Sequence, residues 1–242
     1  MKSPRELLKK FTSPSKRGGN GKRSDCKNDS VANAGENPPP AYDSHDTQPE
    51  SSSSSKHQDL VASTPEDPYA FLSSFDTVFL IDDSGSMEGS SWLEVQRALQ
   101  AITLICVAHD ADGIDLYFLN NQTEEKGDKN QGKASSGRLN IKKSETVAKI
   151  FDTVRPRGAT FTGKRLHHIL KPYLELLERK NGDVESVKPL NIIVITDGAP
   201  SDDVEAPIFT AAKKLDKLDA PSHQLGIQFF QVGNEPGAKE AL

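Results

Sequence analysis

The feature that most constrains the fold is an alternation, from residue 75 to residue 232, between short apolar runs and longer segments with helical periodicity. The runs are rich in β-branched and aromatic residues, which is typical of strands buried on both faces. Strands alternating with helices at this spacing predict right-handed crossovers. We therefore expect a doubly wound α/β fold, a mostly parallel sheet with helices on both faces. The predicted strands are 75–81, 113–119, 138–141, 189–196 and 225–232, and the predicted helices are 91–109, 144–154, 162–180 and 206–218.

Two segments interrupt this pattern. Pro172 lies inside the predicted helix 162–180, and a proline there removes a backbone hydrogen bond, so we expect a kink or a break. Residues 120–137 are polar and long for a connection in a compact domain, which predicts a mobile insertion.

Residues 1–67 differ in composition from the rest of the chain. They are rich in Ser, Pro, Lys, Asn and Gly, and they contain few apolar residues. Such a segment cannot bury enough surface to offset its ordering entropy. We expect residues 1–67 to be a disordered, basic to Ser/Pro-rich tail, and residues 68–242 to form the folded domain.

Charge and hydropathy limit the classes of partner. The first 24 residues carry eight Lys or Arg residues and one acidic residue, although the whole chain has a net charge of -5. This basic segment has a single aromatic residue, Phe11, and no recognised nucleic-acid-binding motif, so we do not expect nucleic-acid binding. The stretch PRELLKKF, residues 4–11, is either a solvated basic tail or a weak peripheral anchor to anionic membrane.

The expected cellular location follows from the absence of recognisable membrane-span and secretion signals in the sequence. No stretch approaches the roughly 20 apolar residues of a membrane span, and the first thirty residues have no apolar core of a secretory signal. The two cysteines suggest neither a disulfide framework nor a zinc site, and Cys106 fits a small core residue. We expect an intracellular, cytoplasmic protein, and the basic stretch KRGGNGKR leaves a nuclear location open.

The tail contains one short candidate for recognition. Pro39, Pro40 and Tyr42 form the pattern P-P-x-Y, which is similar to ligands of WW domains, common recruiters of ubiquitin ligases. Polyproline geometry is preformed and the tyrosine supplies an aromatic anchor. An adaptor or scaffold that acts through this tail is therefore an alternative function.

Oxygen-bearing side chains follow two of the predicted strands. Asp82, Ser84 and Ser86 alternate directly after the strand 75–81, and Asp197 follows the strand 189–196. Because ligands of such sheets bind outside the carboxyl ends of the strands, both carboxylates should reach one edge. Carboxylates and hydroxyls are hard donors suited to Mg²⁺, Mn²⁺ or Ca²⁺.

Three separated motifs carry a family resemblance. The stretch DDSGS, Asp82 to Ser86, resembles the D-x-S-x-S signature of the von Willebrand factor type A (vWA) domain. The stretch GATFTGKRL at 158–166 is similar to the family's G-G-T-x-T-G-x-x-L, and VITDG at 194–198 also matches. The resemblance covers roughly residues 75–242, and the three motifs occur in the family's order.

The resemblance implies a metal-ion-dependent adhesion site. In that arrangement Ser84 and Ser86 bind Mg²⁺ or Mn²⁺ directly, and Asp82 and Asp197 act mainly through water. Thr160 binds directly in the ligand-competent state, and a partner protein's Glu or Asp takes the remaining position. Mg²⁺ keeps several waters in protein sites, which is consistent with this set. The implied function is a non-enzymatic, cation-dependent protein-binding module.

Simpler readings exist for each residue. Ser84 and Ser86 could cap a helix, and Asp197-Gly198 could form an ordinary turn. We favour the metal site because the motifs occur together. We interpret Asp83, Glu88 and Asp202 as solvated loop charges.

An NTP-binding enzyme is the remaining alternative. The stretch GATFTGKR, 158–165, misses the phosphate-binding pattern G-x-x-x-x-G-K-[ST] by one residue, because Arg165 stands where a hydroxyl is required. At the other end of the domain, the sequence ends in GNEPGAKEAL where the family's last helix would begin, so we expect that helix to be short or truncated.

Overall fold

The structure, a computed structural model, describes residues 61–180 and 182–233. The predictions for the tail up to residue 60, the P-P-x-Y pattern included, and for the last nine residues lie outside this part of the chain. The elements are η1 Ala70–Ser74, β1 Asp76–Ile81, η2 Gly85–Met87, α2 Ser90–His109, β2 Ile114–Phe118, β3 Arg138–Ile141, α3 Ser144–Thr153, α4 Thr162–Arg179, η3 Val184–Ser186, β4 Leu190–Thr196, α5 Glu205–Lys217 and β5 Leu225–Gln231.

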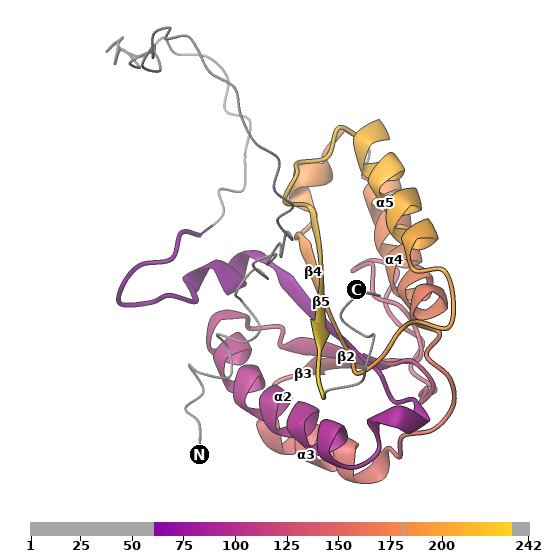
Figure 1. The fold of residues 1–242 in the computed structure, drawn as a ribbon. Helices are drawn as coiled ribbons and strands as arrows, with labels where there is room; N and C mark the ends of the chain where they lie inside the picture. The colour runs from indigo at the N-terminus through magenta and orange to yellow at the C-terminus, as the bar shows by residue number, and fades with distance from the viewer. Residues whose placement is uncertain (1–60, 181, 234–242) are drawn as a thin grey trace, which may run out of the picture. The chain divides into compact units, whose positions relative to one another are not determined.

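The five strands form one sheet in the order β3-β2-β1-β4-β5 (Figure 1). β1 pairs in parallel with β2 and β4, β4 pairs in parallel with β5, and only β3 runs antiparallel to its neighbour. This topology confirms the predicted doubly wound, mostly parallel sheet. The strand order reverses between β1 and β4, where such folds bind ligands.

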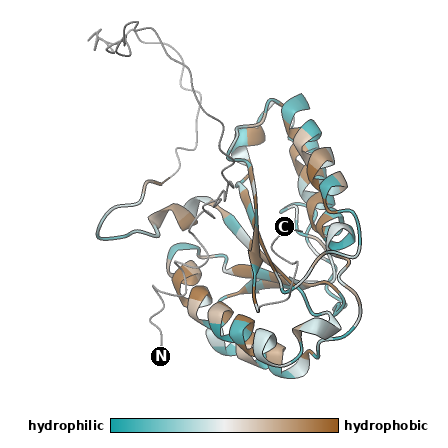
Figure 2. Ribbon diagram, in the orientation of Figure 1, coloured by the Kyte–Doolittle hydropathy of each residue, from teal (hydrophilic) through white to brown (hydrophobic). Residues whose placement is uncertain are grey.

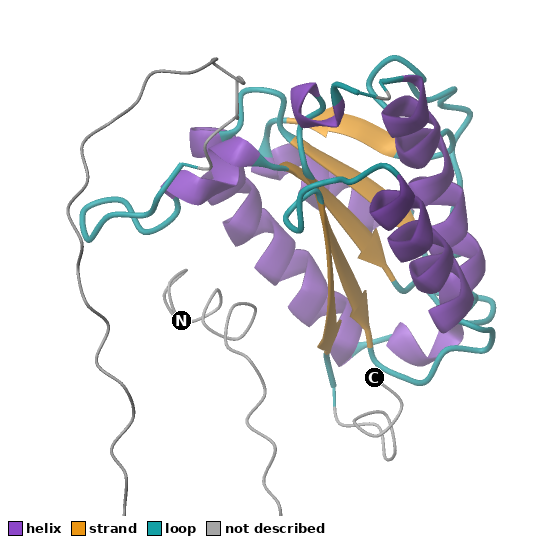
Figure 3. Ribbon diagram, turned by 90° about the horizontal axis from the view of Figure 1, so that it is seen from above, coloured by secondary structure: helices purple, strands orange, loops and turns teal. Residues whose placement is uncertain are grey.

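Helices cover both faces of the sheet (Figures 1 and 3). α2 packs beside α3 on one face, and α4 packs beside α5 on the other. Along β1, Phe79 and Ile81 join the hydrophobic cluster on the α2 side, whereas Val78 and Leu80 join the cluster on the α4 side. Figure 2 shows the hydrophobic colour concentrated along the strands. The continuous apolar run of β1 is thus explained by burial on both faces.

Three aromatic rings tie the start of α2 to the sheet and to α3. The Trp92 ring lies with its centroid 4.6 Å from that of Phe151 and 5.8 Å from that of Phe118. All three side chains are buried, and the rings are tilted rather than stacked face to face. Such pairs stabilise a core beyond their buried area. The first turns of α2 are therefore firmly packed.

α4 continues through Pro172, so the predicted break does not occur. Proline at this position removes the hydrogen bond that a backbone N–H would donate to the preceding turn. The flanking turns bury Leu170, Tyr173 and Leu174, which hold the helix against the sheet and against α5. Packing therefore outweighs the lost hydrogen bond.

Residues 120–137 are fixed to the domain, contrary to the expected mobile insertion. The Lys133 ammonium lies 3.1 Å from an Asp115 carboxylate oxygen of β2, and the two side chains are only 9% and 5% exposed. Arg165 of α4 donates a hydrogen bond to the carbonyl oxygen of Ser136. The polar composition of the segment thus serves internal contacts as well as solvation.

No helix within the described residues is both long and apolar enough to cross a lipid bilayer.

Candidate metal centre

The carboxyl ends of β1 and β4 bring two buried aspartates to one edge of the sheet. Asp82 follows β1 and Asp197 follows β4, and each residue is only 1% exposed. β1 and β4 pair in parallel with Ile81 opposite Ile195, so both strands end at the same level. The sequence prediction that these two residues meet at one edge agrees with this geometry.

Hydroxyl groups link the residues of the first motif to Asp197. The Ser86 hydroxyl donates to Oδ1 of Asp197 at 2.9 Å, and the Oγ atoms of Ser84 and Ser86 lie 3.1 Å apart. The backbone N–H of Ser84 donates to Oδ1 of Asp82 at 2.8 Å. One continuous hydrogen-bonded network thus joins Asp82, Ser84, Ser86 and Asp197. Ser86 is exposed, so this network reaches solvent at that residue.

Thr196 also belongs to this hydrogen-bonded network, although no sequence pattern predicted it. Its hydroxyl donates to Oδ2 of Asp82 at 2.6 Å. The residue is the last of β4 and is 1% exposed. A threonine that ends a strand is common, and only its placement beside β1 reveals this contact.

Thr160 approaches the same edge on the loop before α4. The backbone N–H of Gly85 donates to the carbonyl oxygen of Gly158 at 3.3 Å, which joins this loop to the first motif. Ser201, a second residue that the sequence analysis missed, exchanges hydrogen bonds with the Thr160 backbone. Thr160 is 8% exposed, and its contacts with the neighbouring loops run through backbone groups.

The spacing of the oxygens fits a small divalent cation. Mg²⁺ binds six oxygens at about 2.0–2.1 Å in an octahedron, so neighbouring ligand oxygens lie about 2.8–3.0 Å apart. The distance of 3.1 Å between the Oγ atoms of Ser84 and Ser86 is close to this value. The donor set contains carboxylates and hydroxyls, which suit Mg²⁺ or Mn²⁺. Ser84 and Ser86 would hold the ion directly, together with Thr160 in the ligand-competent state, and Asp82 and Asp197 would act mainly through water, as the resemblance implies.

Asp83 is a structural residue, and its interpretation as a solvated loop charge is wrong. The side chain is buried, and its two oxygens accept the backbone N–H groups of Asn120 and Asn121 at 2.7 and 2.8 Å. Burial raises the pKa of the Asp83 carboxyl, and the amide hydrogen bonds oppose that rise. Asp83 therefore fixes the loop after β2 to the loop after β1.

Glu88 and Asp202 were also interpreted as solvated loop charges, and they differ from each other. Glu88 is exposed, as predicted. Asp202 accepts the backbone N–H groups of Gly163 and Lys164 at 2.9 and 2.7 Å, so it caps the first turn of α4. A carboxylate at a helix N-terminus is favourable because it satisfies amides that have no partner within the helix.

The same contacts bear on the near-phosphate-binding stretch 158–165. In a phosphate-binding loop, backbone N–H groups at the start of a helix point at the phosphates. Here Asp202 occupies the amides of Gly163 and Lys164. Arg165 is buried and donates to the carbonyl oxygen of Phe118, so it is turned into the core. These contacts favour the metal interpretation over nucleotide binding.

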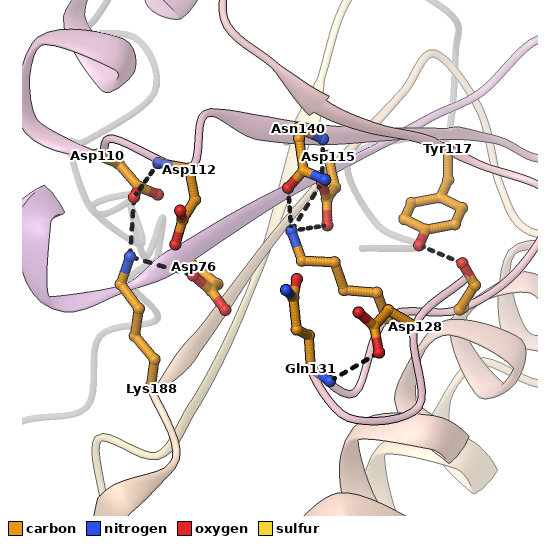
Figure 4. A network of polar contacts seen from close by, with 11 residues as sticks. Asp76, Asp110, Asp112, Asp115, Tyr117, Asp128, Gln131, Asn140 and Lys188 are labelled. Carbon is orange, nitrogen blue, oxygen red and sulfur yellow. Dashed lines mark hydrogen bonds and ion pairs between the residues drawn. The ribbon is translucent and has the colours of Figure 1, made fainter. Parts of the chain in front are cut away.

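A second acidic group lies at the opposite, amino-end edge of the sheet (Figure 4). Oxygens of Asp76, Asp110 and Asp112 lie within 4.8 Å of one another, close enough to hold a cation. The Lys188 ammonium already lies 3.1 Å from Asp76 and 2.9 Å from Asp110. Burial would lower the pKa of Lys188, but Asp110 and Asp76 together raise it. An internal cation therefore neutralises much of this cluster.

The fold and the carboxyl-end site define a doubly wound α/β domain with an oxygen-rich sheet edge. The family model of the von Willebrand factor type A domain matches residues 76–242, which is more than half of the chain. The chain therefore belongs to the von Willebrand factor type A family. Domains of this family mediate protein–protein interactions and often bind a divalent metal. No curated protein matched the sequence.

Proposed function

We propose that this domain is an intracellular, cation-dependent protein-binding module. Mg²⁺ or Mn²⁺ binds at a metal-ion-dependent adhesion site formed by Asp82, Ser84, Ser86, Thr160 and Asp197. The ion then offers its open coordination position to a Glu or Asp of a partner protein. The proposal includes no catalytic step.

The observation that carries the proposal is the oxygen chain from Ser84 through Ser86 to Asp197. The two serine oxygens lie 3.1 Å apart, close to the separation of neighbouring vertices of a magnesium octahedron, and the Ser86 hydroxyl is hydrogen-bonded to Asp197. Hydroxyl ligands are neutral, so an ion held largely by serines keeps most of its positive charge. That charge favours an incoming carboxylate, as the family resemblance implies.

Isothermal titration of Mg²⁺ and Mn²⁺ into the metal-stripped full-length protein tests the site. We expect saturable binding in the parent and its loss in Asp82→Asn, with weaker binding in Thr160→Ala. Asp112→Asn is the matched control, because Asp112 is an exposed member of the acidic cluster at the opposite edge. Binding that survives Asp82→Asn but is lost in Asp112→Asn would move the metal to that edge and refute the proposal.

The tail pattern Pro39-Pro40-x-Tyr42 stays an alternative prediction, because no observation on the described residues favours it. Undiminished pull-down of a Tyr42→Ala variant by WW domains would remove it.

A further inference from the structure

Phe161, the residue directly after Thr160, is held at the surface beside the proposed metal site. Its side chain is 46% exposed, although Thr160 and Thr162 on either side are buried. Exposed apolar residues are common singly, so exposure alone implies nothing. Two further observations, the rigidity of the backbone and the charge of the loop, give Phe161 a role.

The backbone around Phe161 forms a tight turn with a fixed geometry. Phe161 has φ −80° and ψ 65°, and the N–H of Thr162 donates to the carbonyl oxygen of Thr160 at 2.9 Å. These are the features of an inverse γ-turn with Phe161 at its centre. The turn keeps Phe161 out of the helix, while Thr162 begins α4.

Contacts on both sides of the turn restrain it further. The Asn120 side-chain amide donates to the carbonyl oxygen of Ala159 at 3.1 Å. The backbone N–H of Ser201 donates to the carbonyl oxygen of Thr160 at 2.8 Å. Asp202 holds the amides of the next turn. The aromatic ring is thus presented on a pre-organised backbone, which lowers the entropic cost of using it in binding.

The charge of the loop indicates which kind of partner fits. Among residues 155–164 every charged residue is basic, namely Arg155, Arg157 and Lys164, and all three are exposed. The nearby Asp202 carboxylate is turned onto backbone amides. An acidic segment is therefore electrostatically complementary to this rim.

We infer that Phe161 is a specificity residue of the metal site, and this inference rests on the proposed function. Its partner is an acidic segment that carries an apolar side chain within about two residues of the metal-binding Glu or Asp. The carboxylate reaches the ion beside Thr160, and the apolar side chain packs against the Phe161 ring. Aromatic residues in such central positions dominate the binding energy of many interfaces.

A random peptide library displayed on phage tests this inference. The library is bound to the immobilised full-length protein in Mn²⁺ and eluted with EDTA, and the affinities of selected peptides are measured by fluorescence polarisation. We expect peptides with an acidic residue next to an apolar one, and affinity for Phe161→Ala about tenfold weaker than for the parent. Replacing the peptide's apolar residue with Ala should cost affinity for the parent and little for Phe161→Ala.

Leu104→Ala is the control, because Leu104 is 62% exposed and lies near the far end of α2. Its affinities should equal those of the parent, and thermal melting should show that both variants are folded. Metal-dependent peptides without an apolar neighbour, or with equal affinity for Phe161→Ala, would overturn the inference and leave the metal site intact. If the parent instead self-associates through Phe161, then a second copy of the chain, and not an acidic partner, occupies this surface. If EDTA elutes no peptide from the parent, the proposed function falls together with the inference.

Discussion

Buried carboxylates at the two edges of the sheet have different kinds of partner, charged at one edge and neutral at the other. At the amino-end edge, Asp76 and Asp110 contact the Lys188 ammonium (Figure 4). Asp115, in the first half of β2, contacts the Lys133 ammonium. At the carboxyl-end edge, Asp82 accepts hydrogen bonds from the neutral groups of Ser84 and Thr196. Among the described residues, no Lys, Arg or His forms an ion pair with Asp82.

This difference separates carboxylates that stabilise the fold from carboxylates that can take a ligand. An internal ammonium neutralises a buried carboxylate permanently. Hydroxyl donors satisfy its hydrogen bonds but leave its negative charge for an external cation. We therefore expect variants at the amino-end ion pairs to change stability, and variants at the carboxyl-end edge to change metal binding.

The largest expected effect is on stability, from Lys133→Met. The substitution leaves the Asp115 carboxylate buried with no cation, and breaking such a pair typically costs about 3–5 kcal/mol. Urea unfolding monitored by circular dichroism measures the loss. Lys126→Met, an exposed site in the same segment, should change the free energy of unfolding by less than about 0.5 kcal/mol. Equal effects of the two variants would show that the ion pair contributes nothing.

The second effect is the pH dependence of that loss. Burial raises the pKa of Asp115 above its ordinary value of 3.8, and Lys133 opposes the rise. Without Lys133 the folded-state pKa should rise further, so the folded variant takes up a proton at a pH where the unfolded chain does not. Its deficit relative to the parent should shrink by about 1.4 kcal/mol per pH unit as pH falls through the variant's raised pKa. The deficit should stop shrinking at the parent's own folded-state pKa, below which both folded proteins hold the proton. Unfolding at a series of pH values between 7 and 4.5 measures this, and a constant deficit would contradict it.

The third prediction concerns Asp82→Asn, whose effect on stability in the absence of metal should be much smaller than that of Lys133→Met. The amide is similar in shape and removes one of the three buried carboxylates at this edge, Asp82, Asp83 and Asp197, so the free energy of unfolding should stay within about 1 kcal/mol of the parent. Addition of Mg²⁺ should stabilise the parent by about 1.4 kcal/mol when its concentration is roughly tenfold above the dissociation constant. The variant should gain nothing, whereas Lys133→Met should keep the full gain. Loss of the gain in both variants would erase the distinction between the two edges.

The regular elements and the carboxyl-end motif could be predicted from the sequence because both depend on local patterns. The strand predicted at 75–81 became β1 at Asp76–Ile81, and the one at 225–232 became β5 at Leu225–Gln231. The positions of Asp82 and Asp197 followed from the ends of two such strands.

The contacts that were missed join residues far apart in the sequence. Asp83 and Asn120 are 37 positions apart, and Lys188 and Asp110 are 78 positions apart. Within the stretch DDSGS the family pattern singles out Asp82, but it gives no sign that Asp83 is buried. The difference arises only where the loop after β2 supplies amides to Asp83. Likewise, the sequence around Lys133 is typical of a solvated charge. Its ion pair with Asp115 forms only because residues 120–137 fold back onto β2.

The aromatic cluster at the start of α2 gives the molecule an optical property. Trp92 is the chain's single tryptophan, and it lies six positions beyond Ser86 in the sequence. Its indole ring is buried between Phe118 and Phe151. When the protein is excited at the red edge of tryptophan absorption, its fluorescence therefore comes from this one ring. The ring lies just after the loop that would fold around the ion. A change in that emission would record a rearrangement of this loop without any label.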